Sequence, residues 1–109
     1  MIIHFDEQKL EKFDHFKGGK KYINAKMYSD GKNRILYAEI PVGATIGEHK
    51  HETNSEIVYV LEGQGVFIMD GKEERISAGD CHYCPQGHIH TLINNSDDII
   101  KIFAVIPEQ

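Results

Sequence analysis

Residues Gly43 to Gly63 read G-A-T-I-G-E-H-K-H-E-T-N-S-E-I-V-Y-V-L-E-G. This stretch places His49 and His51 two residues apart. Because side chains on an extended strand alternate in direction, both imidazoles should leave the same face as two parallel nitrogen ligands. The polar run 52–55 lets the chain bend, so Glu56 can point back toward them as an oxygen ligand.

A third imidazole for the same site has to come from a distant part of the chain. The best candidate is His90, which stands at the head of a short strand, 91–93. The residues Pro-Gln-Gly at 85–87 precede it and are typical of a turn. The residues therefore predict a cluster of three histidines and one glutamate.

The spacing of these residues resembles the two sequence motifs of the cupin family. Residues 43–63 follow the pattern G-x5-H-x-H-x4-E-x6-G, and residues 79–94 follow G-x5-P-x-G-x2-H-x3-N. The spacer between them, 64–78, is similar in length to that of the smaller cupins. So many fixed positions in register make this signal far more specific than a lone H-x-H pair.

The resemblance implies a double-stranded β-helix of jelly-roll type, formed by a single domain over residues 1–109. It also implies one divalent metal ion held by His49, His51, Glu56 and His90. This ligand set contains no thiolate and suits manganese, iron, cobalt, nickel, copper or zinc. Four protein ligands would tend to close a zinc site, whereas a six-coordinate ion keeps about two positions open, so manganese or iron is favoured.

The rest of the chain predicts an all-β sandwich or barrel independently of the resemblance. Apolar and polar residues alternate over 22–28, which is the pattern of a half-buried strand. Turn residues occupy 29–33, and the pair Asp70-Gly71 is typical of a tight hairpin. Further strands are expected over 35–40, 57–61, 66–69, 73–76 and 99–106.

The two ends of the chain carry further expectations. Residues 6–13 predict a short helix, with Asp6 as the N-cap and with Leu10 and Phe13 on one face. The last strand, 99–106, is apolar on both faces, so a neighbouring element or a second subunit must cover one of them. We expect a homodimer that buries part of this strand or of the strand beside it.

Charge is unevenly distributed along the chain. The first 40 residues carry 8 Lys and Arg against 6 Asp and Glu, and the remainder carries 4 against 11. The acidic part holds the expected site and would repel phosphates, which argues against a nucleic-acid partner. The lysines of the loop 15–21 either stay solvated or form a rim that steers anions.

The sequence contains no apolar run long enough to cross a bilayer and no secretion signal, so we expect a cytoplasmic protein with no membrane partner. Cys81 and Cys84 stand three residues apart. On a strand they face opposite ways, so neither a disulfide nor a shared metal site is expected.

Alternation from the ligands predicts the wall of the substrate pocket. Val58 and Val60 share the face of Glu56, and Leu92 shares that of His90, so the surroundings of the metal should be apolar. Another wall should come from one face of the strand 35–40. Its candidates are Leu36, Ala38 and Ile40, or their alternates Ile35 and Tyr37.

Two further histidines lie near the second motif. His82 shares a strand face with Cys84 and projects either into the pocket or out of it. Because imidazole titrates near neutral pH, it is the candidate catalytic acid or base. His88 lies in the turn before the ligand strand and is expected to face solvent.

These features predict a metal-dependent cupin that acts on a small organic molecule chelating the metal through oxygen atoms. Similar proteins include dioxygenases, isomerases, decarboxylases and lyases, and the fold does not choose among them. The alternative is a non-catalytic module that binds a metal or a small ligand in the same pocket. An enzyme would keep open coordination positions and a positioned acid or base.

Overall fold

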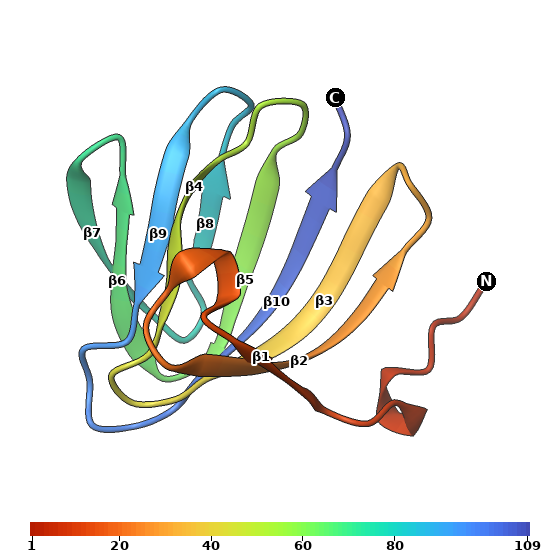
Figure 1. Ribbon diagram of the computed structural model, residues 1–109, viewed down its shortest axis with the longest axis horizontal. Coiled ribbons are helices and arrows are strands. Elements are labelled where there is room, and N and C mark those ends of the chain that lie inside the picture. Colours follow the sequence, from red (N-terminus) through yellow and green to blue (C-terminus); the bar gives the residue numbers. More distant parts are fainter.

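Two β-sheets make up the computed structural model, which describes every residue from Met1 to Gln109 (Figure 1). The strands are β1 (Glu11–Asp14), β2 (Tyr22–Ser29), β3 (Asn33–Ile40), β4 (Thr45–Lys50), β5 (Glu56–Glu62), β6 (Gln64–Met69), β7 (Lys72–Ser77), β8 (Cys81–Cys84), β9 (Ile89–Ile93) and β10 (Ile100–Pro107). Two 3₁₀ turns, η1 (Phe5–Glu7) and η2 (Phe16–Gly18), precede β2. Neither turn has the length or apolar character needed to cross a membrane.

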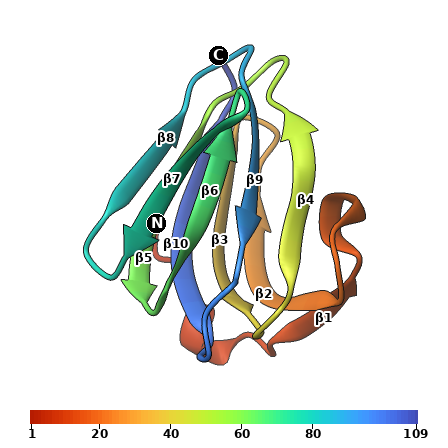
Figure 2. The same ribbon diagram turned by 90° about the vertical axis from the view of Figure 1, so that its left-hand side faces the viewer.

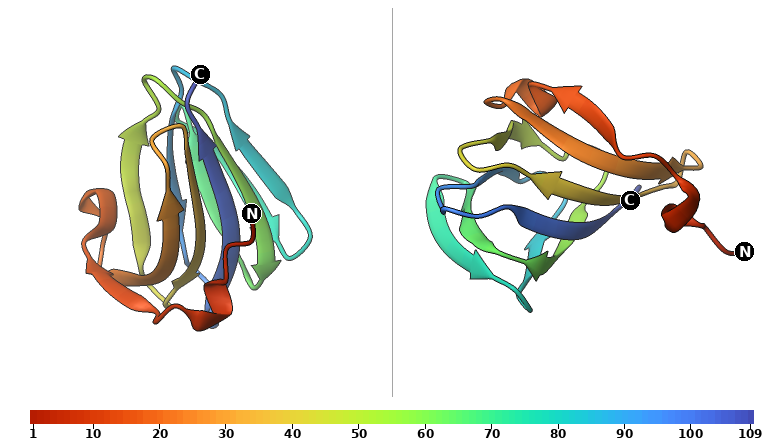
Figure 3. Two further views of the ribbon diagram at one scale, coloured as in Figure 1. Left: turned by 90° about the vertical axis from the view of Figure 1, so that its right-hand side faces the viewer. Right: turned by 90° about the horizontal axis from the view of Figure 1, so that it is seen from below.

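The sheets lie face to face as a sandwich (Figures 2 and 3). The larger has the strand order β1-β2-β3-β10-β5-β8 and the smaller has the order β4-β9-β6-β7. All neighbouring strands are antiparallel. From β3 onward the chain passes repeatedly from one sheet to the other, which is the topology of a double-stranded β-helix. The predicted all-β jelly roll is confirmed.

The core lies between the sheets and is built from alternate residues of each strand. On β3 the row that faces inward is Leu36, Ala38 and Ile40, which are almost completely buried. Their alternates Ile35 and Tyr37 are only half-buried and face outward. Each large aliphatic side chain buried in this way stabilises the fold by about 1.5–3 kcal/mol.

The helix expected over residues 6–13 does not form, and that prediction is wrong. The chain makes the single turn η1 and continues as strand β1, where Phe13 pairs with Ile23 of β2. No side chain caps η1, and a helix of about eight residues forms too few hydrogen bonds to offset its nucleation. Pairing with β2 instead brings Phe13 against the core, so a tertiary contact overrides the local pattern.

The hairpin predicted at Asp70-Gly71 is confirmed. Both residues have positive φ, 52° and 79°, and Met69 pairs with Lys72 across the turn. Positive φ at both central residues is typical of the type I′ turn, whose twist matches that of the flanking strands.

Two motif residues that are not predicted ligands fix the path of the chain. The buried side-chain amide of Asn94 donates hydrogen bonds to three carbonyl oxygens, among them that of Ile40. Gly63 has φ 89°, and a Cβ at this position would lie 2.4 Å from the carbonyl oxygen of Ile99. Only glycine fits there, so part of the motif serves the fold rather than the site.

The outer face of the larger sheet is only partly covered. The ring of Phe5 in η1 packs edge-on against Phe103 of β10, with ring centroids 6.3 Å apart. Phe103 nevertheless remains 36% exposed, and its cross-strand neighbour Tyr59 remains 45% exposed. A neighbouring element thus covers one end of the second apolar face of β10 and leaves the remainder open.

Candidate metal centre and its cavity

Four predicted ligands converge at one end of the sandwich. His49 of β4 lies directly opposite His90 of β9 in the smaller sheet. Glu56 is the first residue of β5 in the larger sheet, and His51 follows the end of β4. The site therefore forms only when the two sheets pack together.

A β-bulge in β4 directs the histidines inward. The register between β4 and β9 shifts between Ile46 and His49. Without the shift, strict alternation would turn Ile46 and His49 to opposite faces. With it, Ile46 is buried in the core, while His49 and His51 both point toward Glu56.

The ligand atoms lie close together. Nε2 of His90 is 3.0 Å from Nε2 of His51 and 3.2 Å from Nε2 of His49. The carboxylate oxygen Oε1 of Glu56 lies 2.9 Å from the Nε2 atom of His90, 3.1 Å from that of His51 and 3.8 Å from that of His49. One ligand atom from each residue falls within 4.8 Å of all the others.

The opposite nitrogen of each imidazole is held by a neighbouring group. His49 donates from Nδ1 to the carbonyl oxygen of Gly47 at 2.7 Å, and His51 donates from Nδ1 to Oδ1 of Asn54 at 2.6 Å. Nδ1 of His90 lies 3.0 Å from Nε2 of His82. Donation from Nδ1 leaves the Nε2 lone pair available and fixes the ring orientation, as in known metal sites.

The cluster attracts positive charge. Burial acts to raise the pKa of Glu56, but hydrogen bonds from His49, His51 and His90 outweigh it and hold this pKa well below the ordinary 4.5. Burial acts to lower the pKa of His51, but hydrogen bonds with Glu56 and Asn54 raise it overall. The carboxylate therefore stays ionised and draws protons or a cation onto the facing nitrogens.

The donor set fits a divalent metal ion. Three imidazole nitrogens this close repel one another unless a proton or a cation stands between them. Two donors about 2.1 Å from one ion and at right angles to each other lie about 3.0 Å apart. Most of the observed spacings lie near this value, so the cluster could hold one metal ion.

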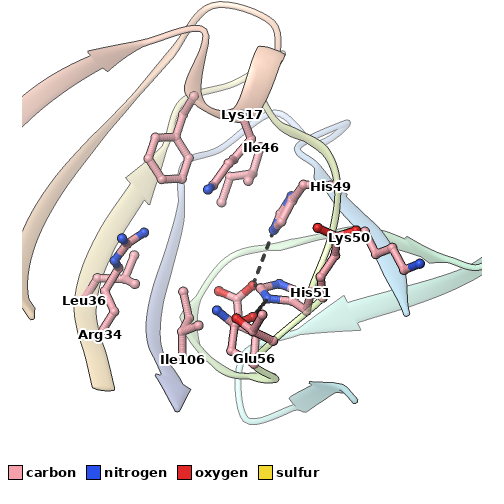
Figure 4. A pocket seen from close by; sticks show the side chains of 13 residues that line it. Lys17, Arg34, Leu36, Ile46, His49, Lys50, His51, Glu56 and Ile106 are labelled. Carbon is pink, nitrogen blue, oxygen red and sulfur yellow. Dashed lines mark hydrogen bonds and ion pairs between the residues drawn. The ribbon is translucent and has the colours of Figure 1, made fainter. Parts of the chain in front are cut away.

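A cavity of about 240 Å³ opens onto the cluster (Figure 4). Apart from the three ligands His49, His51 and Glu56, its lining comes from η2, β3, β4, β10 and the segment after β4. These lining residues are Phe16, Lys17, Arg34, Leu36, Ile46, Lys50, Glu52, Thr53, Asn54 and Ile106. One side of the metal centre is thus accessible to a small molecule.

Comparison with known proteins identifies the family. The cupin domain model matches residues 36–106, which is most of the chain. This chain belongs to the cupin family. An oxalate-binding protein from Thermotoga maritima is 32% identical over 112 residues, which covers 97% of this cupin and 93% of that relative.

Further likeness comes from a solved structure and an enzyme. The crystal structure of a predicted oxalate decarboxylase from Thermotoga maritima superposes with a TM-score of 0.92 at 30% identity, and each chain is covered completely. Quercetin 2,3-dioxygenase from Bacillus subtilis is 32% identical over 87 residues. This cupin aligns over 80% of its own length but spans only 26% of that dioxygenase.

The residues predicted to form the pocket wall lie behind the cluster of three histidines and one glutamate. Val58 and Leu92 are almost fully buried and line a void of about 10 Å³ on the core side of the ligands. Val60 is completely buried and lines neither space. The wall of the cavity that opens onto the cluster is formed by residues of other strands, among them Leu36 of β3.

His82 is buried behind His90 and lines neither space. Its ring stacks on Phe67, with centroids 3.7 Å apart and an interplanar angle of 10°. Burial, with the nearby charge of His90 as the next cause, lowers its pKa to about 4. The neutral imidazole of His82 therefore contacts His90, one of the predicted metal ligands, and does not reach the cavity.

The remaining candidates lie away from the cavity. His88 donates to the carboxylate of Asp70 at 2.5 Å, which joins the turn before β9 to the β6–β7 hairpin. Its side chain is 43% exposed. Cys81 is exposed, Cys84 is buried, and both thiols are free.

Several residues that line the cavity were not predicted from the sequence. Phe16 and Lys17 reach the cavity because η2 folds back over β4, which no local pattern indicates. The lysines of the loop 15–21 were expected to stay solvated or to form a rim that steers anions, and of these Lys17 lines the cavity. Asn54 belongs to the polar run 52–55, which the sequence predicts only to let the chain bend. Arg34 did leave a signal, because it continues the alternating row of Leu36, Ala38 and Ile40.

Proposed function

We propose that this cupin binds a small oxygen-chelating organic acid at a divalent metal ion held by His49, His51, Glu56 and His90. The observation that carries the proposal is the convergence of these ligands at the inner end of an open cavity. A bound ion there supplies a Lewis acid for carboxylate, hydroxyl or keto oxygens. The oxalate-binding relative, similar over nearly its full length, supports an acid as the ligand.

Manganese or iron is the proposed ion. Three imidazoles and one carboxylate without a thiolate do not favour soft metals. Near right-angle spacings among the donors favour six-coordination over a tetrahedral zinc site, and six-coordination leaves about two positions for the acid. Nickel, cobalt, copper and zinc remain competing occupants, because affinity alone does not select among these ions.

The residues around the ion orient it and exclude water. His82 is proposed to position His90 through the contact at Nδ1, because its ring does not reach the cavity. Val58 and Leu92 support the ligands from the core side. They exclude water from that side of the site, which strengthens electrostatic interactions there.

The direct test is isothermal titration of oxalate and small 2-hydroxy acids into the manganese-loaded protein, with metal-free protein as the control. We expect binding that requires the metal. Equal heats with and without manganese would contradict the proposal.

Turnover of the bound acid is the second candidate function. The open side of the metal centre and the likeness to quercetin 2,3-dioxygenase favour it. Incubation of the manganese- and iron-loaded proteins with each acid that binds, in air and under nitrogen, should then give a product detectable by NMR. Unchanged acid in both atmospheres would leave the non-catalytic binding module as the function.

A homodimer is the proposed assembly, with the cytoplasm as its compartment. The open outer face of the larger sheet carries large exposed side chains on three adjacent strands, β8, β5 and β10. They are Tyr83, Ile57, Tyr59, Leu61 and Phe103. A contiguous apolar surface of this kind is typical of an interface between subunits. The free thiols of Cys81 and Cys84 suit a reducing compartment.

A further inference from the structure

The cavity carries positive charge that the proposed metal site does not use. Lys17, Arg34 and Lys50 line it, whereas its only carboxylates are Glu52 and the ligand Glu56. The chain as a whole has a net charge of -5. Cations are therefore concentrated around this cavity against the overall charge of the protein.

None of these cations has an acidic or hydrogen-bonding partner, and Lys17 Nζ lies 5.8 Å from the ring centroid of Phe16, which also lines the cavity. No side chain of Lys17, Arg34 or Lys50 lies within 4.0 Å of a carboxylate, and none donates a hydrogen bond. Figure 4 shows Arg34 on the wall opposite His49, whereas Lys50 extends away from the cluster. Arg34 and Lys17 are thus the cations available to a ligand inside the cavity.

Arg34 occupies an unusual place on its strand. It continues the inward-facing row of β3, whose next members Leu36 and Ala38 are buried core residues. Its cross-strand neighbour is the inward-facing Ile106 of β10. An arginine at the open end of such a row directs a planar fork of donors toward the cavity, a geometry suited to a carboxylate.

Lys17 reaches the same cavity from a different element, the turn η2. Its residue has φ 56°, a left-handed conformation that is uncommon outside glycine. The loop that holds it lies tightly on β4, where a Cβ on Gly47 would come within 2.1 Å of the Lys17 carbonyl oxygen. The fold therefore presents Lys17 from a fixed backbone rather than from a loose tail.

The cavity also has an apolar part of its lining. Phe16, Leu36, Ile46 and Ile106 supply it. A ligand filling the cavity would meet the metal, this hydrocarbon lining and the cationic donors.

Resting on the proposed function, we propose that the ligand is a chelating diacid longer than oxalate. Its 2-oxo or 2-hydroxy carboxylate end binds the metal, short apolar carbons contact the apolar lining, and Arg34 and Lys17 bind the distal carboxylate. Oxalate uses both of its carboxylates when it chelates a metal, so it has no distal carboxylate left for Arg34.

Matched acids separate this inference from simple chelation. The probes are 2-oxopentanedioate against 2-oxopentanoate, and 2-hydroxybutanedioate against 2-hydroxybutanoate, each titrated calorimetrically into manganese-loaded protein. The members of a pair differ only in the distal carboxylate. We expect at least one diacid to bind about tenfold or more tightly than its monoacid, because charge-assisted hydrogen bonds are strong.

The variants are Arg34→Gln and the matched control Arg75→Gln, which changes the other arginine of the chain, on β7 and outside this cavity. Arg34→Gln should abolish most of the diacid preference while metal content and monoacid affinity stay unchanged. Arg75→Gln should keep the preference. Lys17→Met should reduce it in part.

Two outcomes would overturn the inference. If monoacids or oxalate bind as tightly as the diacids, or if Arg34→Gln keeps the full preference for diacids, Arg34 does not bind a distal carboxylate. The proposed function would still stand in that case. If none of the acids binds manganese-loaded protein, both the inference and the proposed function fail.

Discussion

His51 shows how neighbouring groups hold one member of the candidate metal centre in place. Its Nδ1 donates to Asn54 at 2.6 Å, and its Nε2 faces Glu56 and His90. Its backbone is fixed as well, because the N–H of His51 donates to the carbonyl oxygen of His88. The ring thus has one orientation available before any ion binds.

Removing the support of this ring should weaken metal binding without removing a ligand. For Asn54→Ala we expect a loss of manganese affinity of about 10–100-fold, which is typical for the partner of a metal-bound histidine. Asn95→Ala changes an exposed asparagine and is the matched control. Competition titration against a chelator measures both. Equal affinities for the two variants would contradict the positioning role of Asn54.

Metal affinity should also depend on pH in a defined direction. In the metal-free protein the pKa of His51 is raised, so protons compete with the ion as pH falls through a range that begins above the ordinary value of 6.5. Glu56, whose pKa is depressed, stays ionised and does not limit binding. Manganese affinity measured from about pH 8 to about pH 6 should fall steadily with release of protons on binding. A flat profile would contradict the assignment of imidazole ligands.

The contact between the η2 loop and β4 places Phe16 and Lys17 at the cavity. Gly47 has no room for a side chain, because its added Cβ would lie 2.1 Å from the carbonyl oxygen of Lys17. The two backbones can touch only if this residue is glycine.

Gly47→Ala should therefore lift the loop that carries Phe16 and Lys17. We expect a destabilisation of about 1–3 kcal/mol, typical of overpacking, measured by urea unfolding. The control is Glu48→Ala, the next residue on β4, whose side chain is exposed. The same unfolding midpoint for both variants would show that the loop does not rest on β4 as described.

Elements with local signals were predictable from the sequence. The Asp70-Gly71 turn and the alternation over 22–28 depend on residues that are neighbours in the chain. The helix prediction for 6–13 is wrong because the conformation of Phe13 depends on its pairing with Ile23, a contact that no local pattern contains. The spacing of the apolar residues in 6–13 cannot by itself distinguish a short helix from a short edge strand.

In the candidate site, too, residues with a local sequence signal were predictable and residues placed by distant contacts were not. Spacing within motifs predicted His49, His51, Glu56 and His90 because a strand projects alternate residues and the motif resemblance supplies the distant partner. The cavity wall could not be predicted, since it depends on the β3–β10 register and on where η2 folds. Val58 and Leu92 were placed on the correct face, but that face is the core side of the ligands.

In the whole molecule, the outer face of the larger sheet exposes large apolar side chains, and we expect a partner to cover them. Phe103 pairs across strands with both Tyr37 and Tyr59, so aromatic side chains adjoin one another on this face. Phe5 covers only one part of it. A second copy placed about a twofold axis would bury the rest.

Light scattering should give about twice the chain mass of 12.4 kDa at micromolar concentration. Tyr59→Lys should shift the protein to monomer, because a like charge would meet its symmetry mate in a dry interface. Val42→Lys introduces the same charge at a similarly exposed apolar residue outside this sheet. Monomeric wild type, or a dimer that survives Tyr59→Lys, would contradict the proposed interface.

Elemental analysis measures whether His49, His51, Glu56 and His90 together hold one divalent ion. Protein purified without an affinity tag from manganese- and iron-supplemented cells should contain about one ion per chain. Glu56→Gln should lose most of it, whereas His88→Ala, which removes a histidine outside the cluster, should retain it. Wild-type protein without stoichiometric metal, or full metal content in Glu56→Gln, would contradict the account.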